Sequence, residues 1–231
     1  MALSDSLSRL NQEITACRRC PRLVAWREKV AREKTKRYET EKYWGRPVPG
    51  FGDAEARVLL VGLAPAAHGG NRTGRVFTGD RSGDWLFRAL HKAGFANQPE
   101  SLHRKDGLEL SDCYVSASAR CAPPDNRPEP DEFANCRPFL LRELRLLSRV
   151  RVVVGLGKIG FDHAYQALCE VRGHEAQGRP HFGHGAEFRL DPELCLLGSF
   201  HPSQQNTFTG KLTEDMFDSV FARVRALLDL G

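Results

Sequence analysis

The 231-residue chain has no apolar run long enough to span a membrane, and its first residues lack the charged and apolar segments of a signal peptide. These absences favour a protein without membrane contact and a cytoplasmic location. The hydrophobic content of 41% is near that of globular domains. Because the length suits one well-buried core, we expect a single domain over residues 1–231.

A large excess of one charge is also absent. The chain has 34 Lys and Arg against 29 Asp and Glu, which gives a formal net charge of +5. This excess is modest support for a polyanionic partner such as nucleic acid.

Seven cysteines in a chain without an export signal are unlike a disulfide framework. Cys113, Cys169 and Cys195 lie in or beside apolar segments, so we expect them in the core. The other four have arginines or prolines close by, and the first two form a CRRC pair. Four such thiolates could hold zinc or an iron-sulfur cluster, and spacing alone does not choose between them. These candidate ligands are Cys17, Cys20, Cys121 and Cys136.

Apolar, strand-like runs alternate with helical patterns along the chain. This alternation predicts an α/β fold, a three-layer α/β/α sandwich with a central four-stranded parallel sheet. The charged residues 27–37 favour a solvated helical face followed by a loop, with an arm against nucleic-acid phosphate as the alternative. The expected strands are 57–62, 112–118, 150–155 and 194–199, and the expected helices are 3–16, 83–95, 131–147, 157–171 and one after Leu212.

The segment GLGKIG, residues 155–160, matches the glycine fingerprint of dinucleotide-binding proteins. It lies on the third expected strand instead of the first, and the acidic residue at the expected distance, Glu175, falls in a loop. A tight turn between strand and helix accounts for these glycines.

The segment GLAPAAHGGNRTGRVFTGD, residues 62–80, has no acidic residue before its last position. It follows a strand-like run, and open α/β sheets bind ligands at the carboxyl ends of their strands. Its glycines allow backbone amides to approach a flat or anionic group, and Arg72 and Arg75 add positive charge. The alternative is an ordinary surface loop.

A second loop, GSFHPSQQNTFTGKLT, follows the last expected strand. Pro202 keeps His201 out of a helix, and uncharged polar residues follow that could enter a nucleic-acid groove and fill the gap left by an extruded base. The alternative is a solvated loop with an incidental histidine. Because parallel strands end at one edge, we expect a shared pocket there, containing Phe77, Asp80, Asn126 and His201.

Together, the two loops, the CRRC pair and RCAPPDNRP with Cys136 resemble the uracil-DNA glycosylase superfamily, specifically its iron-sulfur-containing family 5, or B-type, enzymes. The resemblance covers nearly the whole chain. It implies hydrolysis of the bond between a damaged base and deoxyribose in DNA, the first step of base excision repair. It also implies a nucleoid-associated monomer with a structural 4Fe-4S cluster on the four cysteines, zinc being the alternative.

The resemblance further implies roles for individual residues. Phe77 would stack on the extruded base, and His201 would donate a hydrogen bond to the base oxygen. Asp80 is the only acid in or just after the first loop, so we expect it to position water or stabilise the sugar cation, with a helix N-cap as its alternative role. Asn126 would contact base or water, with a turn residue as its alternative. The remaining expected contacts are Gly62, Ala64 and His68 to the base, Arg72, Gln204, Gln205, Asn206 and Lys211 to DNA, and Arg120 and Arg127 facing phosphate.

Two departures from the family pattern bear on specificity. Residues 63–67 are apolar where other members carry an acid or amide, and Ala117 stands where relatives selective for uracil carry asparagine. Because a missing polar reader weakens discrimination, we expect a broad substrate range that includes hypoxanthine. The alternatives are a non-catalytic, metal-stapled nucleic-acid-binding protein and a nucleotide-binding enzyme that uses GLGKIG.

Overall fold

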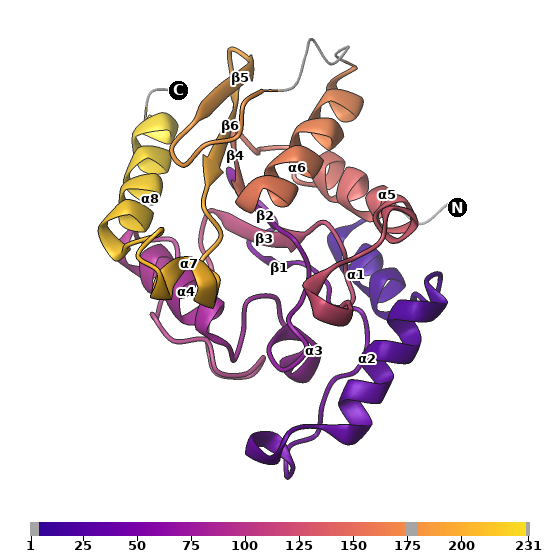
Figure 1. Cartoon of the computed structure of the whole chain (residues 1–231). Coiled ribbons are helices and arrows are strands. Elements are labelled where there is room, and N and C mark those ends of the chain that lie inside the picture. Colours follow the sequence, from indigo (N-terminus) through magenta and orange to yellow (C-terminus); the bar gives the residue numbers. More distant parts are fainter. Residues whose placement is uncertain (1–4, 174–179, 230–231) are drawn as a thin grey trace.

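A six-stranded sheet forms the centre of the computed structural model, which describes residues 5–173 and 180–229 (Figure 1). The strands lie in the order β1-β3-β2-β4-β6-β5. Their bounds are β1 Phe51–Gly52, β2 Val58–Gly62, β3 Cys113–Ala117, β4 Val152–Leu156, β5 Glu187–Asp191 and β6 Leu194–Ser199.

The sheet is mixed, which corrects the prediction of a purely parallel sheet of four strands. The four predicted strands pair in parallel as β3-β2-β4-β6. The two edge strands, β1 and β5, pair antiparallel with β3 and β6. Sequence patterns did not indicate these edges because β1 has two residues and β5 has no apolar run.

The helices expected from periodicity correspond to α1, α4, α5, α6 and α8, with ends shifted by a few residues; residues 3 and 4 of the first lie outside the described residues. In the described ranges, no helix is both long and apolar enough to cross a bilayer. The helix bounds are α1 Leu7–Ala16, α2 Pro21–Glu33, α3 Gly70–Thr73, α4 Arg81–Lys92, α5 Pro130–Leu146, α6 Gly157–Arg172, α7 Gln204–Phe208 and α8 Glu214–Asp229, with 3-10 helices η1 Lys36–Tyr38 and η2 Pro124–Asn126.

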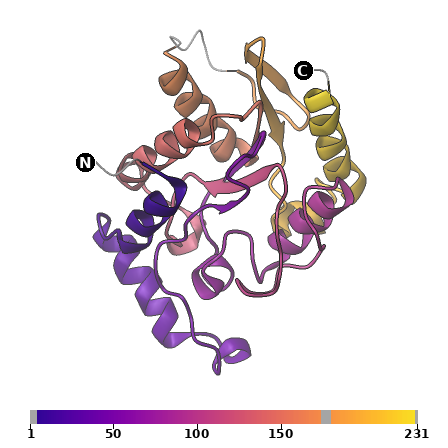
Figure 2. The same cartoon turned by 180° about the vertical axis from the view of Figure 1, so that it is seen from behind.

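Helices cover both faces of the sheet (Figures 1 and 2). Helices α4 and α8 pack on the face that includes Val58 and Leu60. Helices α5 and α6 pack on the opposite face, which includes Leu59 and Val61. Burial on both faces explains why β2 is apolar throughout instead of alternating. The three cysteines expected in the core, Cys113, Cys169 and Cys195, are buried there.

Close packing explains the glycines of residues 155–160. A Cβ on Gly160 would lie 2.3 Å from the carbonyl oxygen of Val61, so only glycine lets α6 approach β2. Gly157 has a φ of +81° and lies against His201, whose Cβ would be 3.1 Å from a Cβ added there. The turn interpretation therefore accounts for the motif, while Glu175 lies outside the described residues.

Candidate active site

The glycine-rich loop, residues 62–80, leaves the carboxyl end of β2 and winds through α3 to the start of α4. Its arginines fold inward. The Arg75 guanidinium is 2.7 Å from the Asp106 carboxylate in a buried ion pair. It also donates to the hydroxyls of Thr78 and Ser101. This network fixes the second half of the loop against the segment that follows α4.

Arg72 is buried as well, with 7% of its side chain exposed. Its Nε donates to the His68 carbonyl at 2.7 Å, and its Nη2 donates to the Gly79 carbonyl at 2.8 Å. Its Nη1 lies 2.5 Å from the Glu41 carboxylate, and the guanidinium stacks 3.9 Å from the centre of the Tyr38 ring. Arg72 therefore joins the glycine-rich loop to residues 38 and 41, which precede it in the chain.

Phe77 and His201 lie side by side at the edge of the sheet. Their ring centroids are 5.7 Å apart with an angle of 33° between the planes. The half-buried Phe77 ring covers Gly62, where a Cβ would come within 2.8 Å of it. Phe77 has a φ of +49°, a backbone strain of about 1–3 kcal/mol that the surrounding packing must hold. The two loops therefore converge as the sequence predicted.

Asp80 is the N-cap of α4, so its alternative role is present in the structure. Its Oδ1 accepts a hydrogen bond from the Gly83 amide at 3.0 Å. The other oxygen, Oδ2, lies 1.8 Å from the position that a Cβ on Gly69 would take, so a side chain there would displace the carboxylate. Burial raises the pKa of Asp80. The carboxyl group thus has one oxygen in the cap and one directed at the loop.

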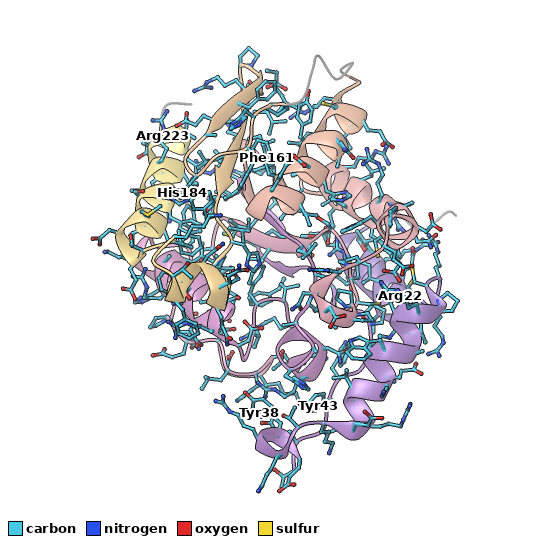
Figure 3. The ribbon with its side chains drawn as sticks, viewed as in Figure 1. Arg22, Tyr38, Tyr43, Phe161, His184 and Arg223 are labelled. Carbon is cyan, nitrogen blue, oxygen red and sulfur yellow. The ribbon has the colours of Figure 1, made fainter. Side chains whose placement is uncertain are left out.

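His201 is held by its backbone and has a strongly perturbed imidazole. The Asn206 side-chain amide donates to the His201 carbonyl at 2.9 Å, a contact that positions the histidine. The preceding residue, Phe200, donates its amide to Nδ1 of His184, which also contacts α8 through the Met216 carbonyl (Figure 3). Burial lowers the pKa of His201 to about 4, so the ring is neutral at neutral pH.

The remaining expected base contacts lie in the glycine-rich loop and in η2. Ala64 is half-buried directly after β2. The Nδ1 of His68 is 3.0 Å from the hydroxyl of Tyr43, a buried residue that the sequence patterns did not single out. Asn126 is exposed in η2 at a φ of +55°, as its turn interpretation predicts. Among the described residues, no hydrogen bond joins Asn126 to Asp80 or His201.

Helix α7 and the turn after it present expected DNA-contacting side chains on the surface. Gln204 and Gln205 on α7 and Lys211 in the turn are exposed. Beside them, Phe208 is 68% exposed and Arg81 stacks 4.2 Å from the centre of its ring. An exposed phenylalanine supported by an arginine is an unusual surface feature that sequence analysis passed over because its neighbours are all polar.

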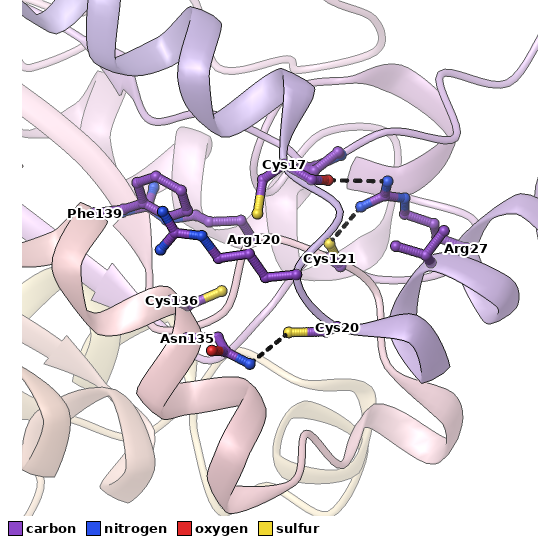
Figure 4. Close-up of a pocket in the computed structure, with 11 residues that line it drawn as sticks. Cys17, Cys20, Arg27, Arg120, Cys121, Asn135, Cys136 and Phe139 are labelled. Atoms are coloured by element: carbon purple, nitrogen blue, oxygen red, sulfur yellow. Dashed lines mark hydrogen bonds between the residues drawn. The ribbon is translucent and has the colours of Figure 1, made fainter.

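The four candidate cysteine ligands line one pocket (Figure 4). Cys17 caps the end of α1, Cys20 precedes α2, Cys121 follows β3, and Cys136 lies within α5. All four are free thiols. Segments far apart in the sequence therefore bring their sulfurs to a common cavity, as the two-pair pattern predicted.

Two buried arginines, Arg27 and Arg120, also line this pocket. Arg27 donates to the Cys121 sulfur at 2.8 Å, and Arg120 pairs with Glu143 at 2.5 Å. Arg120 is 1% exposed, so the expectation that it faces phosphate is wrong. The Nε and Nη1 of Arg120 and the Nε of Arg27 are buried without a partner. Unpaired cationic donors around four thiols fit an anionic group such as a cluster held by thiolates.

The sulfurs do not converge on a point. Among the described residues, no group of three or more His, Cys, Asp or Glu side chains is placed to hold a single metal ion. A tetrahedral zinc ion needs sulfurs about 2.3 Å from one centre, which this arrangement does not provide. Burial raises the pKa of Cys121 to about 12, so any metal group would have to displace protons on binding.

Comparisons with known proteins agree with this geometry. The family model described as "Uracil DNA glycosylase superfamily" matches residues 49–225. The chain belongs to the uracil-DNA glycosylase superfamily. It is 50% identical to the Type-5 uracil-DNA glycosylase of Mycobacterium leprae (strain TN) over 225 residues, 97% of this chain and 96% of the relative.

Two further relatives of the superfamily refine the placement. The Type-5 uracil-DNA glycosylase of Thermus thermophilus is 51% identical over 95% of this chain and 97% of its own length. The Type-4 uracil-DNA glycosylase of Pyrobaculum aerophilum is 28% identical over 85% of this chain and 83% of its own length. The expected resemblance to family 5 is confirmed.

The lowered pKa of His201 makes a prediction for stability. The imidazole titrates near pH 6.5 when unfolded and near pH 4 in the fold, so the unfolded state binds more protons between these values. The free energy of unfolding therefore keeps its full value above pH 6.5 and decreases as the pH falls toward 4, because proton binding favours the unfolded state. Thermal melts should therefore show the wild type losing Tm faster than His201→Gln across this range.

The exposed His91 supplies the matched control, since His91→Gln should follow the wild type at every pH. A constant Tm difference between wild type and His201→Gln from pH 7 to about 4 would contradict a buried, neutral His201.

Proposed function

We propose that the chain is a DNA glycosylase that hydrolyses the N-glycosidic bond of uracil and other deaminated bases, hypoxanthine included, to initiate base excision repair. The observation that carries the proposal is the convergence of Phe77 and His201, 5.7 Å apart, beside the Asp80 carboxylate loop. Close relatives named uracil-DNA glycosylases support it. Such an enzyme would act as a monomer with the nucleoid in the cytoplasm.

The proposed pocket takes a base that has left the DNA stack. The Phe77 ring offers a flat face, fixed over Gly62, on which the base would stack. Ala64 and the backbone of the glycine-rich loop would enclose its edges, with His68 held by Tyr43 at the rim. Stacking of a base on an aromatic side chain contributes about 1–3 kcal/mol.

His201 would stabilise the departing base. Breaking the bond between C1′ of the sugar and the base nitrogen leaves negative charge on the base, which spreads to its oxygen. A neutral imidazole donates one N–H to that oxygen without transferring its proton, and a pKa of about 4 keeps the ring in this form. The Asn206 contact to the His201 backbone would keep the donor in place.

Asp80 would act on the sugar side of the reaction. One carboxylate oxygen is committed to the α4 cap, which fixes the group, and the other is directed at the loop beside Gly69. From there it would stabilise the positive charge on the sugar and orient the water whose oxygen bonds to C1′. It would accept a proton from that water, while the base leaves and is protonated from solvent.

Surface residues of α7, of the turn after it and of η2 would engage the duplex. Phe208, exposed and supported by Arg81, suits a wedge that fills the space of the extruded base. Gln204 and Gln205 would contact the strand beside it, and Lys211 would contact phosphate. Asn126, exposed on η2, would meet the DNA from the other side of the pocket.

The end of β3 supports broad base specificity. Ala117 pairs in register with Gly62, so its methyl group lies where strand β3 meets the base pocket. An asparagine at this position would offer an amide to the edge of uracil, and alanine offers none. Without that polar reader, hypoxanthine loses no hydrogen bond that uracil keeps, and discrimination falls.

The four cysteines would hold a 4Fe-4S cluster with a structural role. They join the α1–α2 turn, the segment after β3 and α5, and hydrolysis of a glycosidic bond moves no electrons. The unpaired donors of Arg27 and Arg120 would then face the sulfurs. Arg120 also ties the pocket to the sheet, because its partner Glu143 accepts from Ser116 on β3 at 2.6 Å.

The test of the proposed function is excision from a labelled duplex that contains one uracil or one hypoxanthine. Wild type should produce abasic sites from both. Asp80→Asn should lower the rate about 10²-fold or more with an unchanged Tm, because asparagine caps a helix as well as aspartate. Asp80→Ala should lose the rate and also about 0.5–2 kcal/mol of stability with the cap. His201→Gln should lower the rate about 10²- to 10³-fold.

The exposed Asp84, in the same first turn of α4, provides the control, and Asp84→Asn should cleave like wild type. Duplex binding by the wild type without excision of either base would discard the enzymatic function and leave a DNA-binding protein. Excision of uracil alone would discard the broad specificity.

The cluster has its own test. Protein purified without oxygen should be brown, absorb broadly near about 400 nm and contain about four irons per chain. Cys121→Ser should lose colour and iron, whereas Cys169→Ala, a buried cysteine of the core, should keep both. A wild type with one zinc and no iron, or full iron in Cys121→Ser, would contradict the assignment.

A further inference from the structure

Residues 34–46, the basic arm, run from the end of α2 through η1 to Arg46. The arm contains five basic and two acidic residues, and one of the acids, Glu41, is already paired with the buried Arg72. Its exposed basic residues are Lys36, Arg37, Lys42 and Arg46. A concentrated positive charge therefore faces solvent.

The basic arm lies at the same end of the molecule as the candidate active site. In both views, η1 projects beyond α3 at the lower end, toward which β6 also runs into α7 (Figures 1 and 2). After Arg81, Arg37 supplies positive charge that acts on Asp84 in the first turn of α4. The arm thus lies within electrostatic reach of the helix that Asp80 caps.

The basic arm is fastened to the glycine-rich loop. The Tyr38 ring stacks on Arg72, and the Tyr43 hydroxyl contacts Nδ1 of His68 at 3.0 Å (Figure 3). The Trp44 amide donates to the Arg72 carbonyl at 2.9 Å. Because these contacts order the arm in advance, a ligand that binds it pays little conformational entropy.

A second basic segment continues the surface. The exposed Arg104 stacks 4.5 Å from the centre of the Trp44 ring, and Lys105 follows it. This segment is fixed by Asp106, the partner of Arg75 in the glycine-rich loop. Two ordered basic segments are therefore fastened to the glycine-rich loop.

We propose that the basic arm binds the phosphate backbone of duplex DNA flanking the extruded nucleotide. The inference rests on the proposed function, since it places the arm on the same DNA molecule that enters the pocket. Ordered, exposed cations suit phosphates, which position a protein on DNA without reading sequence. Lysine and arginine contacts of this kind release counterions, so they make binding depend on salt.

The experiment compares Lys36→Gln/Lys42→Gln with Arg145→Gln/Arg149→Gln. The control pair is also exposed and removes the same charge, but Arg145 lies in the last turn of α5 and Arg149 in the segment that leads to β4, at the opposite end of the parallel strands. Fluorescence anisotropy would give the Kd for a labelled duplex with one tetrahydrofuran abasic analogue from about 50 to 200 mM salt. The slope of log Kd against log salt should become shallower by about 1.8 in the arm variant, because each lost contact removes about 0.9.

A slope in the arm variant equal to that of wild type, or an equal change in the control pair, would overturn the proposal. Excision of uracil from a trinucleotide, which is too short to reach the arm, distinguishes a lost phosphate contact from damage to the base pocket. A loss on the trinucleotide as large as on the duplex would mean that the arm acts through the pocket and not on phosphate. No excision by wild type would instead refute the proposed function, while the salt slopes would still decide the arm.

Discussion

The buried guanidinium of Arg72 is the interaction on which the candidate site depends. A glycine-rich loop has little intrinsic preference for one conformation, and ordering it costs entropy. Arg72 binds two carbonyls of that loop, stacks on Tyr38 and pairs with Glu41, so one side chain holds both the loop and the basic arm. The strained Phe77 follows in the same loop and relies on this frame.

The cysteine pocket plays a comparable role on the other side of the glycine-rich loop. Arg27 contacts Cys121 and also accepts, at its backbone carbonyl, a hydrogen bond from Asn71 in α3. Arg120 reaches through Glu143 to Ser116, two residues before Ser118, whose hydroxyl donates to the Gly62 carbonyl. A group bound to the four cysteines would therefore stabilise the start of the glycine-rich loop, at Gly62, through these contacts. This fits a structural role and needs no redox step.

Sequence patterns predicted the interior of this protein better than its edges. The four central strands and five long helices follow from apolar runs and periodicity, which burial on both faces produces. Strands β1 and β5 were not predicted because these edge strands lack a long apolar run. Arg72 and Arg120 were expected to contact phosphates because a charged residue in a predicted loop is usually exposed. Their burial depends on tertiary partners, Glu41 and Glu143, that are distant in sequence. The four cysteines were found because arginines or prolines lie close to each of them and because the first two form a CRRC pair.

The most direct test of this account is kcat/KM for the uracil trinucleotide with Arg72→Lys, a substrate that does not involve the basic arm. Lysine keeps the charge but cannot donate to two carbonyls while stacking on Tyr38. The account predicts a loss of about tenfold or more, equivalent to about 1.4 kcal/mol of transition-state stabilisation, whereas the exposed Arg104→Lys should match wild type. Wild-type excision by Arg72→Lys would contradict it.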